Sequence, residues 1–463
     1  MENDHAALCV STPEVSRYLE DSVAYICRQV PGLAGFFTIT GSENLTNCWS
    51  HQKGMDCPLC SKRSPEDVIS DVNISIRKGI AAANSKTRLI AWDWGWKDEW
   101  APGIIKRLPG DVALMSVSEW SIPIERGGIE TSVGEYSISV VGPGPRALKH
   151  WSIAAENGLE SFAKLQVNNT WELSSVPYIP AVANVARHIT NLRDKNIKGL
   201  MLGWTLGGHP SPNLEVVAEL SRPGNLTVDQ ALLNVAEKRF GNTAAPAVVS
   251  AWETFSTAFS EFPYHAGTVY NAPLQSGPSN LLHAQKTGYK STMVGLPYDD
   301  LDSWRSVYPS GIFIQQMGKV AEGFRKGLQI LNEADRGDSA TALQRGNLAQ
   351  EKRIAEVCSI HFQSVANQSS FVLNRDALAA AEDYNSATAL ITRLRELLRE
   401  ELNLASRLRQ LQLEDSRFGF EASNHYFYIP QDLAEKVLNC QFLLGKWLPG
   451  QEKRFKKTRL KKD

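Results

Sequence analysis

The sequence predicts an α/β fold, a (β/α)8 barrel of the TIM type, followed by an all-α helical domain. Three observations predict it: strand-like and helix-like patterns alternate in the first part of the chain, carboxylates and tryptophans follow the strand-like runs, and long amphipathic helices take over later. With 463 residues the chain exceeds one ordinary core, so we expect a barrel domain at 1–220 and a helical domain at 221–463.

Six short apolar runs rich in β-branched residues predict the strands of the first domain. Between the first three of them, residues 13–29 and 65–83 carry apolar side chains at helical spacing. Strands that alternate with helices are parallel strands joined by crossovers, which is the pattern of a barrel. The predicted strands are residues 6–10, 35–40, 88–92, 111–117, 162–167 and 199–205.

Six strands are two fewer than a closed barrel contains. If they are the last six, residues 35–40 form the fourth strand and residues 162–167 the seventh, and the missing N-terminal pair is expected upstream of Met1. Residues 136–141, which precede the segment GPGPR, are predicted as an extra hairpin after the sixth strand. The alternative is a barrel strand that shifts the count by one.

Long amphipathic patterns predict an α-helical bundle after residue 221. The predicted helices are residues 228–240, 245–259, 313–333, 341–374, 386–412 and 431–447. Between the second and the third lies an aromatic loop, 263–310, which we expect to act as a lid. The basic tail, 450–463, is expected to be solvated and disordered, with a nucleic-acid arm as the alternative.

The charge and the cysteine content limit the kinds of partner and the cellular compartment that we expect. The net charge of -1 supplies no global field for nucleic acid or an anionic membrane, so we expect neither partner. No signal-peptide pattern and no apolar run of membrane-spanning length is present, which favours a cytoplasmic location for the chain as given. Cys9, Cys27, Cys358 and Cys440 are scattered in apolar surroundings, which argues against a disulfide framework and for a reducing compartment.

Four carboxylates stand at or just beyond the ends of predicted strands: Glu43, Asp93, Glu119 and Glu172. Cleavage of a glycosidic bond needs two positioned carboxyl groups, one to protonate the leaving oxygen and one to attack or stabilise the anomeric carbon. The set therefore indicates a catalytic site. The alternative for each residue is a charge at a helix N-cap or first turn, where acids are favoured.

Aromatic and polar residues accompany these carboxylates and favour a carbohydrate partner. Tryptophan faces stack on the apolar faces of sugars, and Asn or His side chains hydrogen-bond to hydroxyl groups. Core tryptophans and a hydrogen-bonded loop histidine are the alternatives. The expected substrate-binding residues are Trp94, Trp120, Asn169, Trp171, Trp204 and His209.

Glu43 in TGSEN and Glu172 in NNTWEL, at the ends of the predicted fourth and seventh strands, resemble the carboxylate pair of the retaining (β/α)8 glycosidases. That resemblance covers roughly residues 6–220. It implies Glu43 as the acid/base and Glu172 as the nucleophile. A tryptophan after the eighth strand is also usual in that group, and Trp204 in GLMLGWTLGG stands there.

The chain resembles a second group more loosely, the β-N-acetylhexosaminidase-type barrels, in which an adjacent Asp-Glu pair follows the fourth strand. Those enzymes use the acetamido group of the substrate as the nucleophile. Here Ser42 precedes Glu43, so the polarising aspartate is missing at that position. Substrate-assisted chemistry would need Asp93 or Glu119 in that role.

Cys48, His51, Cys57 and Cys60 form a C-x2-H-x5-C-x2-C pattern in the loop after the predicted fourth strand. Three thiolates and one imidazole are a ligand set that tetrahedral zinc binds, and four protein ligands make a closed, structural site. We therefore expect zinc to brace the loop that carries Glu43. The alternatives are redox chemistry at CPLC and a loop of reduced thiols.

These features together predict a glycoside hydrolase that acts on a β-linked glycan, with N-acetylhexosamine-containing glycans as one candidate class. The alternative is a non-catalytic carbohydrate-binding protein or a truncated, inactive barrel, since a barrel short of two strands exposes sheet edges. A nucleic-acid partner is a third alternative, which the neutral charge and the absence of a known binding motif disfavour.

Overall fold

A computed structural model describes residues 7–42, 44–204, 208–291, 295–334, 340–423 and 425–459, with side chains up to residue 457. The chain forms two compact units. Unit 1 comprises residues 1–122, 142–165 and 191–202, and unit 2 comprises residues 123–141, 166–190 and 203–463. Two stretches between strands of unit 1, residues 123–141 and 166–190, thus belong to unit 2.

Unit 1 is built on a five-stranded parallel sheet with the order β1-β2-β3-β6-β7. The strands are β1 (Gly35–Ile39), β2 (Arg88–Trp92), β3 (Val112–Val117), β6 (Ser161–Lys164) and β7 (Ile197–Met201). Each lies beside the next strand of the sheet along the chain, as barrel strands do, whereas a doubly wound sheet reverses its order at a switch point. The sheet therefore has the order of a contiguous arc of a barrel. The predicted closure of that barrel is not seen among the described residues.

Helices cover one face of this sheet. They are α1 (Pro13–Gln29), α2 (Pro65–Ala82), α3 (Ala101–Arg107) and α4 (Pro145–Glu156). Side chains at alternate strand positions, such as Leu89, Ala91 and Leu114, share one apolar core with these helices. Helices α1 and α2 pack closely, because a Cβ at Gly79 would stand 2.4 Å from the carbonyl oxygen of Glu20.

The predicted strand at residues 6–10 is wrong for the part that the structure describes. Residues 7–10 form no strand, and Thr12 donates from its backbone N–H and its hydroxyl to the carbonyl oxygen of Cys9, at 3.0 and 2.8 Å. The apolar character of the run has another cause, since Val10 is buried in the core of unit 1. The described sheet consequently has five strands where six were predicted.

A hairpin does follow β3, but not at the predicted residues 136–141, which form no strand. It consists of β4 (Pro123–Arg126) and β5 (Ile129–Ser132), which pair antiparallel in unit 2. Gly127 and Gly128 join them with φ values of 58° and 78°, the backbone that a tight hairpin turn requires and that glycine adopts readily. The sequence signal was therefore the Gly-Gly pair rather than the later apolar run.

The rest of unit 2 is mainly helical, as predicted. Helices α7 and α8 coincide with two predicted ranges, and the four longer predictions overlap α11, α12, α13 and α14 with its π-helical extension η6 (Leu443–Trp447). The elements are α5 (Val182–Leu192), which crosses into unit 1 at its end, α6 (Pro212–Leu220), α7 (Val228–Phe240), α8 (Ala245–Phe259), α9 (Ala272–Ser276), α10 (Leu301–Arg305), α11 (Ser310–Glu333), α12 (Ala342–Ala380), α13 (Tyr384–Glu414), β8 (Phe420–Glu421), β9 (His425–Tyr426), α14 (Pro430–Phe442) and α15 (Leu448–Arg459).

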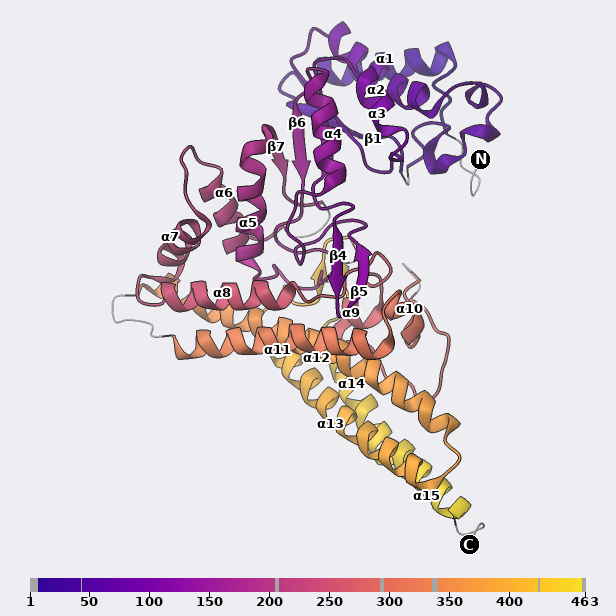
Figure 1. Cartoon of the computed structure of the whole chain (residues 1–463), viewed down its shortest axis with the longest axis vertical. Coiled ribbons are helices and arrows are strands. Elements are labelled where there is room, and N and C mark those ends of the chain that lie inside the picture. The colour runs from indigo at the N-terminus through magenta and orange to yellow at the C-terminus, as the bar shows by residue number, and fades with distance from the viewer. Residues whose placement is uncertain are drawn as a thin grey trace. The chain divides into compact units, whose positions relative to one another are not determined.

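The long helices pack in succession, α8 on α11, α11 on α12, α12 on α13 and α13 on α14 (Figure 1). Aromatic rings fill the first two of these contacts: Phe255 stacks on Phe324 with ring centroids 5.1 Å apart, and Phe324 stacks on Phe362 at 5.9 Å. Deeper along the bundle, Lys436 donates to Glu401 at 3.0 Å, and both side chains are fully buried. The apolar periodicity that predicted the helices is thus the packing surface of the bundle.

The predicted disorder of the basic tail is wrong for residues 450–459, which belong to α15. Two contacts explain the helix: Phe455 is buried, and Arg395 of α13 pairs with Glu452. The last four residues, 460–463, lie outside the described part of the chain. Among the described helices, none is long and apolar enough to cross a membrane.

Candidate functional site

The loop after β1 lies against the loop after β2 through two glycines. A Cβ at Gly95, whose φ is 77°, would stand 2.6 Å from the carbonyl oxygen of Gly41, and Trp96 Nε1 donates to Thr40 Oγ1 at 2.9 Å. This close approach holds the C-terminal end of β1 at the edge of the sheet. Glu43, the predicted acid/base, follows two residues after Gly41 and lies outside the described residues.

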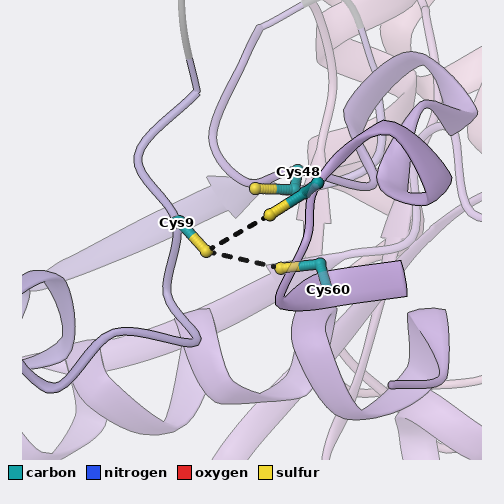
Figure 2. Close-up of side chains that lie close together, drawn as sticks. Cys9, Cys48 and Cys60 are labelled. Atoms are coloured by element: carbon teal, nitrogen blue, oxygen red, sulfur yellow. Dashed lines mark hydrogen bonds between the residues drawn. The ribbon is translucent and has the colours of Figure 1, made fainter. Parts of the chain in front are cut away.

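Farther along this loop the chain gathers sulfur atoms. The sulfur atoms of Cys9, Cys48, Cys57 and Cys60 all lie within 4.8 Å of one another. Cys9 Sγ is 3.5 Å from Cys60 Sγ and 3.7 Å from Cys57 Sγ, and Figure 2 shows the sulfur atoms of the labelled residues directed toward one another. All four are free thiols. The short 3₁₀ turns that shape the loop are η1 (Ser50–Gln52), η2 (Gly54–Asp56) and η3 (Cys60–Lys62).

These separations suit a tetrahedral metal site. With Zn–S bonds of about 2.3 Å, two thiolates on a tetrahedral zinc lie about 3.8 Å apart. Burial raises the pKa of Cys57, but hydrogen bonds from the backbone of Cys60 and Leu59 and with the other thiols together outweigh it and lower the pKa to about 7. Burial raises the pKa of Cys48. One thiol of the group therefore ionises readily at neutral pH. The four cysteines can hold a metal ion with every ligand position filled by protein.

The expected ligand His51 is not in this group. Its side chain is exposed, and its backbone is left-handed, with a φ of 55°. Cys9 takes the fourth place from the segment before α1, where Ser11 Oγ also lies 3.2 Å from Cys60 Sγ. Local spacing could not identify Cys9, because the fold alone brings it to the loop. The signal available in the sequence was a cysteine just ahead of the first helix.

Asp93, directly after β2, is a buried partner of α4. Its Oδ2 accepts from Arg146 Nη1 at 3.0 Å and lies 2.7 Å from His150 Nδ1. Burial alone would raise the pKa of Asp93, but the charge of Arg146 and the hydrogen bond with His150 outweigh it and lower the pKa. An anion compensated in this way orients α4 and is poorly placed for proton transfer.

Trp94 and Trp120 lie together beyond the ends of β2 and β3. Their ring centroids are 5.0 Å apart, and the guanidinium of Arg146 lies over the Trp120 ring, 4.6 Å from its centroid. Glu119 immediately precedes Trp120 and is fully buried. Unit 1 thus gathers four of the predicted site residues, Asp93, Trp94, Glu119 and Trp120, at the C-terminal ends of neighbouring strands.

Glu172, the predicted nucleophile, is enclosed by hydrogen-bond donors of unit 2. Its Oε1 accepts from the hydroxyls of Ser137, at 2.8 Å, and Ser139. Its Oε2 accepts from the backbone N–H of Ile138 and from the Thr170 hydroxyl, each at 2.7 Å. Burial raises the pKa of Glu172, and these donors lower it without cancelling the rise. Both oxygens therefore bind the protein itself and tie residues 137–139 to residues 170–172.

The other predicted binding residues also belong to unit 2 and differ in exposure. Asn169 is buried, and its Nδ2 donates to two carbonyl oxygens of its own loop at 3.0 and 2.7 Å. Trp171 is half-buried, whereas Trp204, after β7, is 41% exposed. Burial, together with the charge of Arg417, lowers the pKa of His209, which is half-buried. Asn169 thus shapes its loop, and the other side chains are at least partly accessible.

Two residues that the sequence does not single out, Tyr270 and Glu135, are linked to Trp171: Tyr270 lies beside it, and Glu135 contacts Tyr270. The ring centroids of Trp171 and Tyr270 are 5.7 Å apart, and the Tyr270 hydroxyl donates to Glu135 Oε2 at 2.6 Å. Tyr270 belongs to the predicted aromatic loop, 263–310, which was the available signal. Glu135 follows the hairpin, and nothing in its local sequence distinguishes it from an ordinary surface glutamate.

Comparisons with known proteins identify the fold at a distance. No protein-family model and no curated protein matches the chain. Among solved structures, a GH138 enzyme described as targeting pectin rhamnogalacturonan II is similar with a TM-score of 0.53 at 12% identity, over 99% of this chain and 66% of that chain.

Two further structures are less similar. A family 89 glycoside hydrolase from Clostridium perfringens has a TM-score of 0.39 at 11% identity, over 84% of this chain and 41% of that chain. The chitobiase of Flavobacterium johnsoniae has a TM-score of 0.27 at 12% identity, over 92% of this chain and 59% of that chain. All three neighbours are glycoside hydrolases, and the chain spans less than two thirds of the length of each. At these identities the likeness is one of fold, and it rests on the first structure.

Proposed function

We propose that the chain is a glycoside hydrolase that acts on a β-linked glycan. The observation that carries the proposal is a parallel sheet in chain order, with carboxylates and tryptophans after the C-terminal ends of its strands, in a fold similar to that of a GH138 enzyme. In barrels of this strand order the active site forms at those ends. Paired carboxylates flanked by aromatic rings suit the cleavage of a glycosidic bond.

Glu43 and Glu119 are the carboxylates that we assign to catalysis. Asp93 is compensated by a buried arginine, and Glu172 is enclosed by donors, which argues against either as the second catalytic group. Glu119 directly follows β3 and precedes Trp120, a residue stacked on another tryptophan. The proposal keeps Glu43 as the acid/base and gives the second role to Glu119 in place of Glu172.

Isosteric amide variants test this assignment. Glu43→Gln and Glu119→Gln should each lower kcat by about 10² to 10⁴-fold with an unchanged melting temperature, because each removes one acid or base from the reaction. Substrates would be aryl β-glycosides and oligosaccharides. Loss of turnover in Glu172→Gln at the wild-type melting temperature, with Glu119→Gln active, would return the nucleophile to Glu172. An inactive wild type that still binds glycans would mean a carbohydrate-binding protein.

The substrate class has two candidates within this proposal. The hexosaminidase-type resemblance favours N-acetylhexosamine-containing glycans, and the GH138 enzyme of similar fold is described as targeting pectin rhamnogalacturonan II. Chitooligosaccharides and rhamnogalacturonan II fragments, compared by kcat/KM, distinguish them. Proton NMR of the anomer that is released first distinguishes a retaining from an inverting mechanism. Retention corresponds to catalytic carboxyl groups about 5 to 5.5 Å apart, and inversion to about 6.5 to 9.5 Å.

We also propose that the four-cysteine group binds zinc. A closed set of four thiolates is a structural site, and here it would tie the segment before α1 to the loop that carries Glu43. The purified protein should contain about one zinc ion per chain by mass spectrometry. Cys9→Ser should lose the zinc and lower the melting temperature, whereas His51→Ala should keep both. Zinc lost in His51→Ala and kept in Cys9→Ser would reinstate the ligand set expected from the sequence.

A further inference from the structure

Three loops of unit 2 are locked together by buried polar side chains. The first two are joined by Glu172, whose carboxylate accepts from Ser137, Ile138 and Thr170 as described above. Because all of these groups are buried, opening this contact would leave a carboxylate and several donors without partners. Residues 137–139 and 170–172 therefore keep a fixed geometry.

Gln275 joins the second loop to the third. Its Nε2 donates to the carbonyl oxygens of Trp171, at 3.0 Å, and Val269, at 2.6 Å, and its Oε1 accepts from Ser174 Oγ at 2.5 Å. The glutamine is 1% exposed. Asn271 adds a helix cap, since its Oδ1 accepts from the backbone N–H at position 274 at 2.8 Å, the start of α9. Hydrogen bonds at residues 269 and 271 thus fix the backbone on either side of residue 270.

Each locked loop presents one side chain at the surface of this cluster, and the side chain from the third loop contacts the other two. They are Glu135, Trp171 and Tyr270. The Tyr270 ring is tilted 44° to the Trp171 ring, its hydroxyl donates to Glu135, and the side chain is 41% exposed. Each stands within one or two residues of a buried anchor, at Ser137, Glu172 and Asn271. The pair of rings and the carboxylate are therefore preorganised.

We propose that Glu135, Trp171 and Tyr270 form a sugar-binding subsite. An aromatic face with a tyrosine hydroxyl and a carboxylate at its edge matches a pyranose ring, whose apolar face stacks and whose hydroxyls donate to oxygen acceptors. Rigid rings lose little conformational entropy on binding, which favours recognition of a weakly apolar ligand. The inference rests on the proposed function and deepens it, since it assigns a glycan-binding subsite to residues of unit 2.

Glycan affinity tests the subsite apart from turnover. In the catalytically silenced Glu119→Gln background, chitotetraose and rhamnogalacturonan II fragments would be titrated by intrinsic fluorescence and calorimetry. Trp171→Ala and Tyr270→Ala should weaken binding of the recognised glycan about tenfold or more, because each removes a stacking face. Tyr270→Phe keeps the ring and loses the hydrogen bond to Glu135, so it should weaken binding by a smaller factor. Circular dichroism and melting temperature would show that each variant is folded.

Tyr289→Ala is the matched control, because Tyr289 lies in the same aromatic loop and is 63% exposed. It should bind like the parent. Equal affinities in all variants, a loss in the control as large as in Tyr270→Ala, or no glycan bound by the parent would overturn the subsite. Hydrolysis by the wild type with unchanged Trp171→Ala and Tyr270→Ala affinities would reject the subsite alone. Weakened binding in these variants without any hydrolysis by the wild type would reject the hydrolase alone.

Discussion

Asp93 in unit 1 and Glu172 in unit 2 are two carboxylates that both follow a strand of the parallel sheet but have different surroundings. Each lies beyond the end of a parallel strand, and each is fully buried. Asp93 contacts Arg146 and His150, and its pKa is lowered. Burial raises the pKa of Glu172, and the hydroxyls and backbone N–H groups around it offset that rise only in part.

The difference shows that burial after a strand does not identify a catalytic acid. A buried charge needs compensation, and the two sites provide it differently: one with a cation and the other with neutral dipoles. In both cases the carboxylate organises the protein around it, α4 for Asp93 and two loops for Glu172. At Glu172 both oxygens accept hydrogen bonds from the protein, whereas at Asp93 the contacts with Arg146 and His150 fall on Oδ2.

Of the two carboxylates, Asp93 should cause the larger loss of folding free energy when its charge is removed. Asp93→Asn leaves the guanidinium of Arg146, which is 4% exposed, without its buried partner. Breaking a buried ion pair from one side costs about 3 to 5 kcal/mol of folding free energy. Urea unfolding followed by circular dichroism measures the loss.

Asp98→Asn is the control for this experiment, because Asp98 accepts from Nε of the same arginine but is 63% exposed. An exposed pair contributes about 0 to 1 kcal/mol, so the control should be nearly as stable as the wild type. Similar losses in the two variants would mean that burial of the Asp93 pair adds nothing, and the contrast with Glu172 would then disappear.

Replacing Glu172 should cost less folding free energy than replacing Asp93. In Glu172→Gln the amide nitrogen, itself a donor, replaces one acceptor oxygen and faces donors, so about 1 to 3 kcal/mol of folding free energy should be lost. Turnover per folded molecule should persist if Glu172 orders its loops only. Glu130→Gln, an exposed change on β5, should stay within about 0.5 kcal/mol of the wild type. A fully stable but inactive Glu172→Gln would contradict the positioning role.

What could be predicted from the sequence depended on whether the signal was local. Helix α7 was predicted to the residue from apolar side chains at helical spacing, and in the structure Thr227 and Gln230 form a capping box at its start. Five of the six predicted strands lie within a few residues of strands in the structure, and the exception is the run at residues 6–10. The order of the strands followed from the alternation of strands and helices.

The parts that failed are those that the tertiary fold decides. Cys9 joins the thiols of a distant loop, and no spacing rule connects it to Cys48. The cage around Glu172 is built from Ser137 and Ser139, in a run predicted as a strand, and only the folded chain shows that these hydroxyls meet a carboxylate. The division at residue 220 and the catalytic roles stay predictions.

The pH dependence of stability is the finest test of the comparison, because the two carboxylates should respond with opposite sign. The folded pKa of Asp93 lies below the ordinary 3.8, so its contribution is present above pH 3.8 and is lost as the pH falls through the folded value. The folded pKa of Glu172 lies above the ordinary 4.5, so its contribution is present below pH 4.5 and is lost as the pH rises through the folded value. As the pH falls below 3.8, the stability advantage of the wild type over Asp93→Asn should therefore shrink, whereas its advantage over Glu172→Gln should shrink as the pH rises above 4.5. Slopes of the same sign in both pairs of unfolding curves would show that the surrounding charges do not distinguish the two sites.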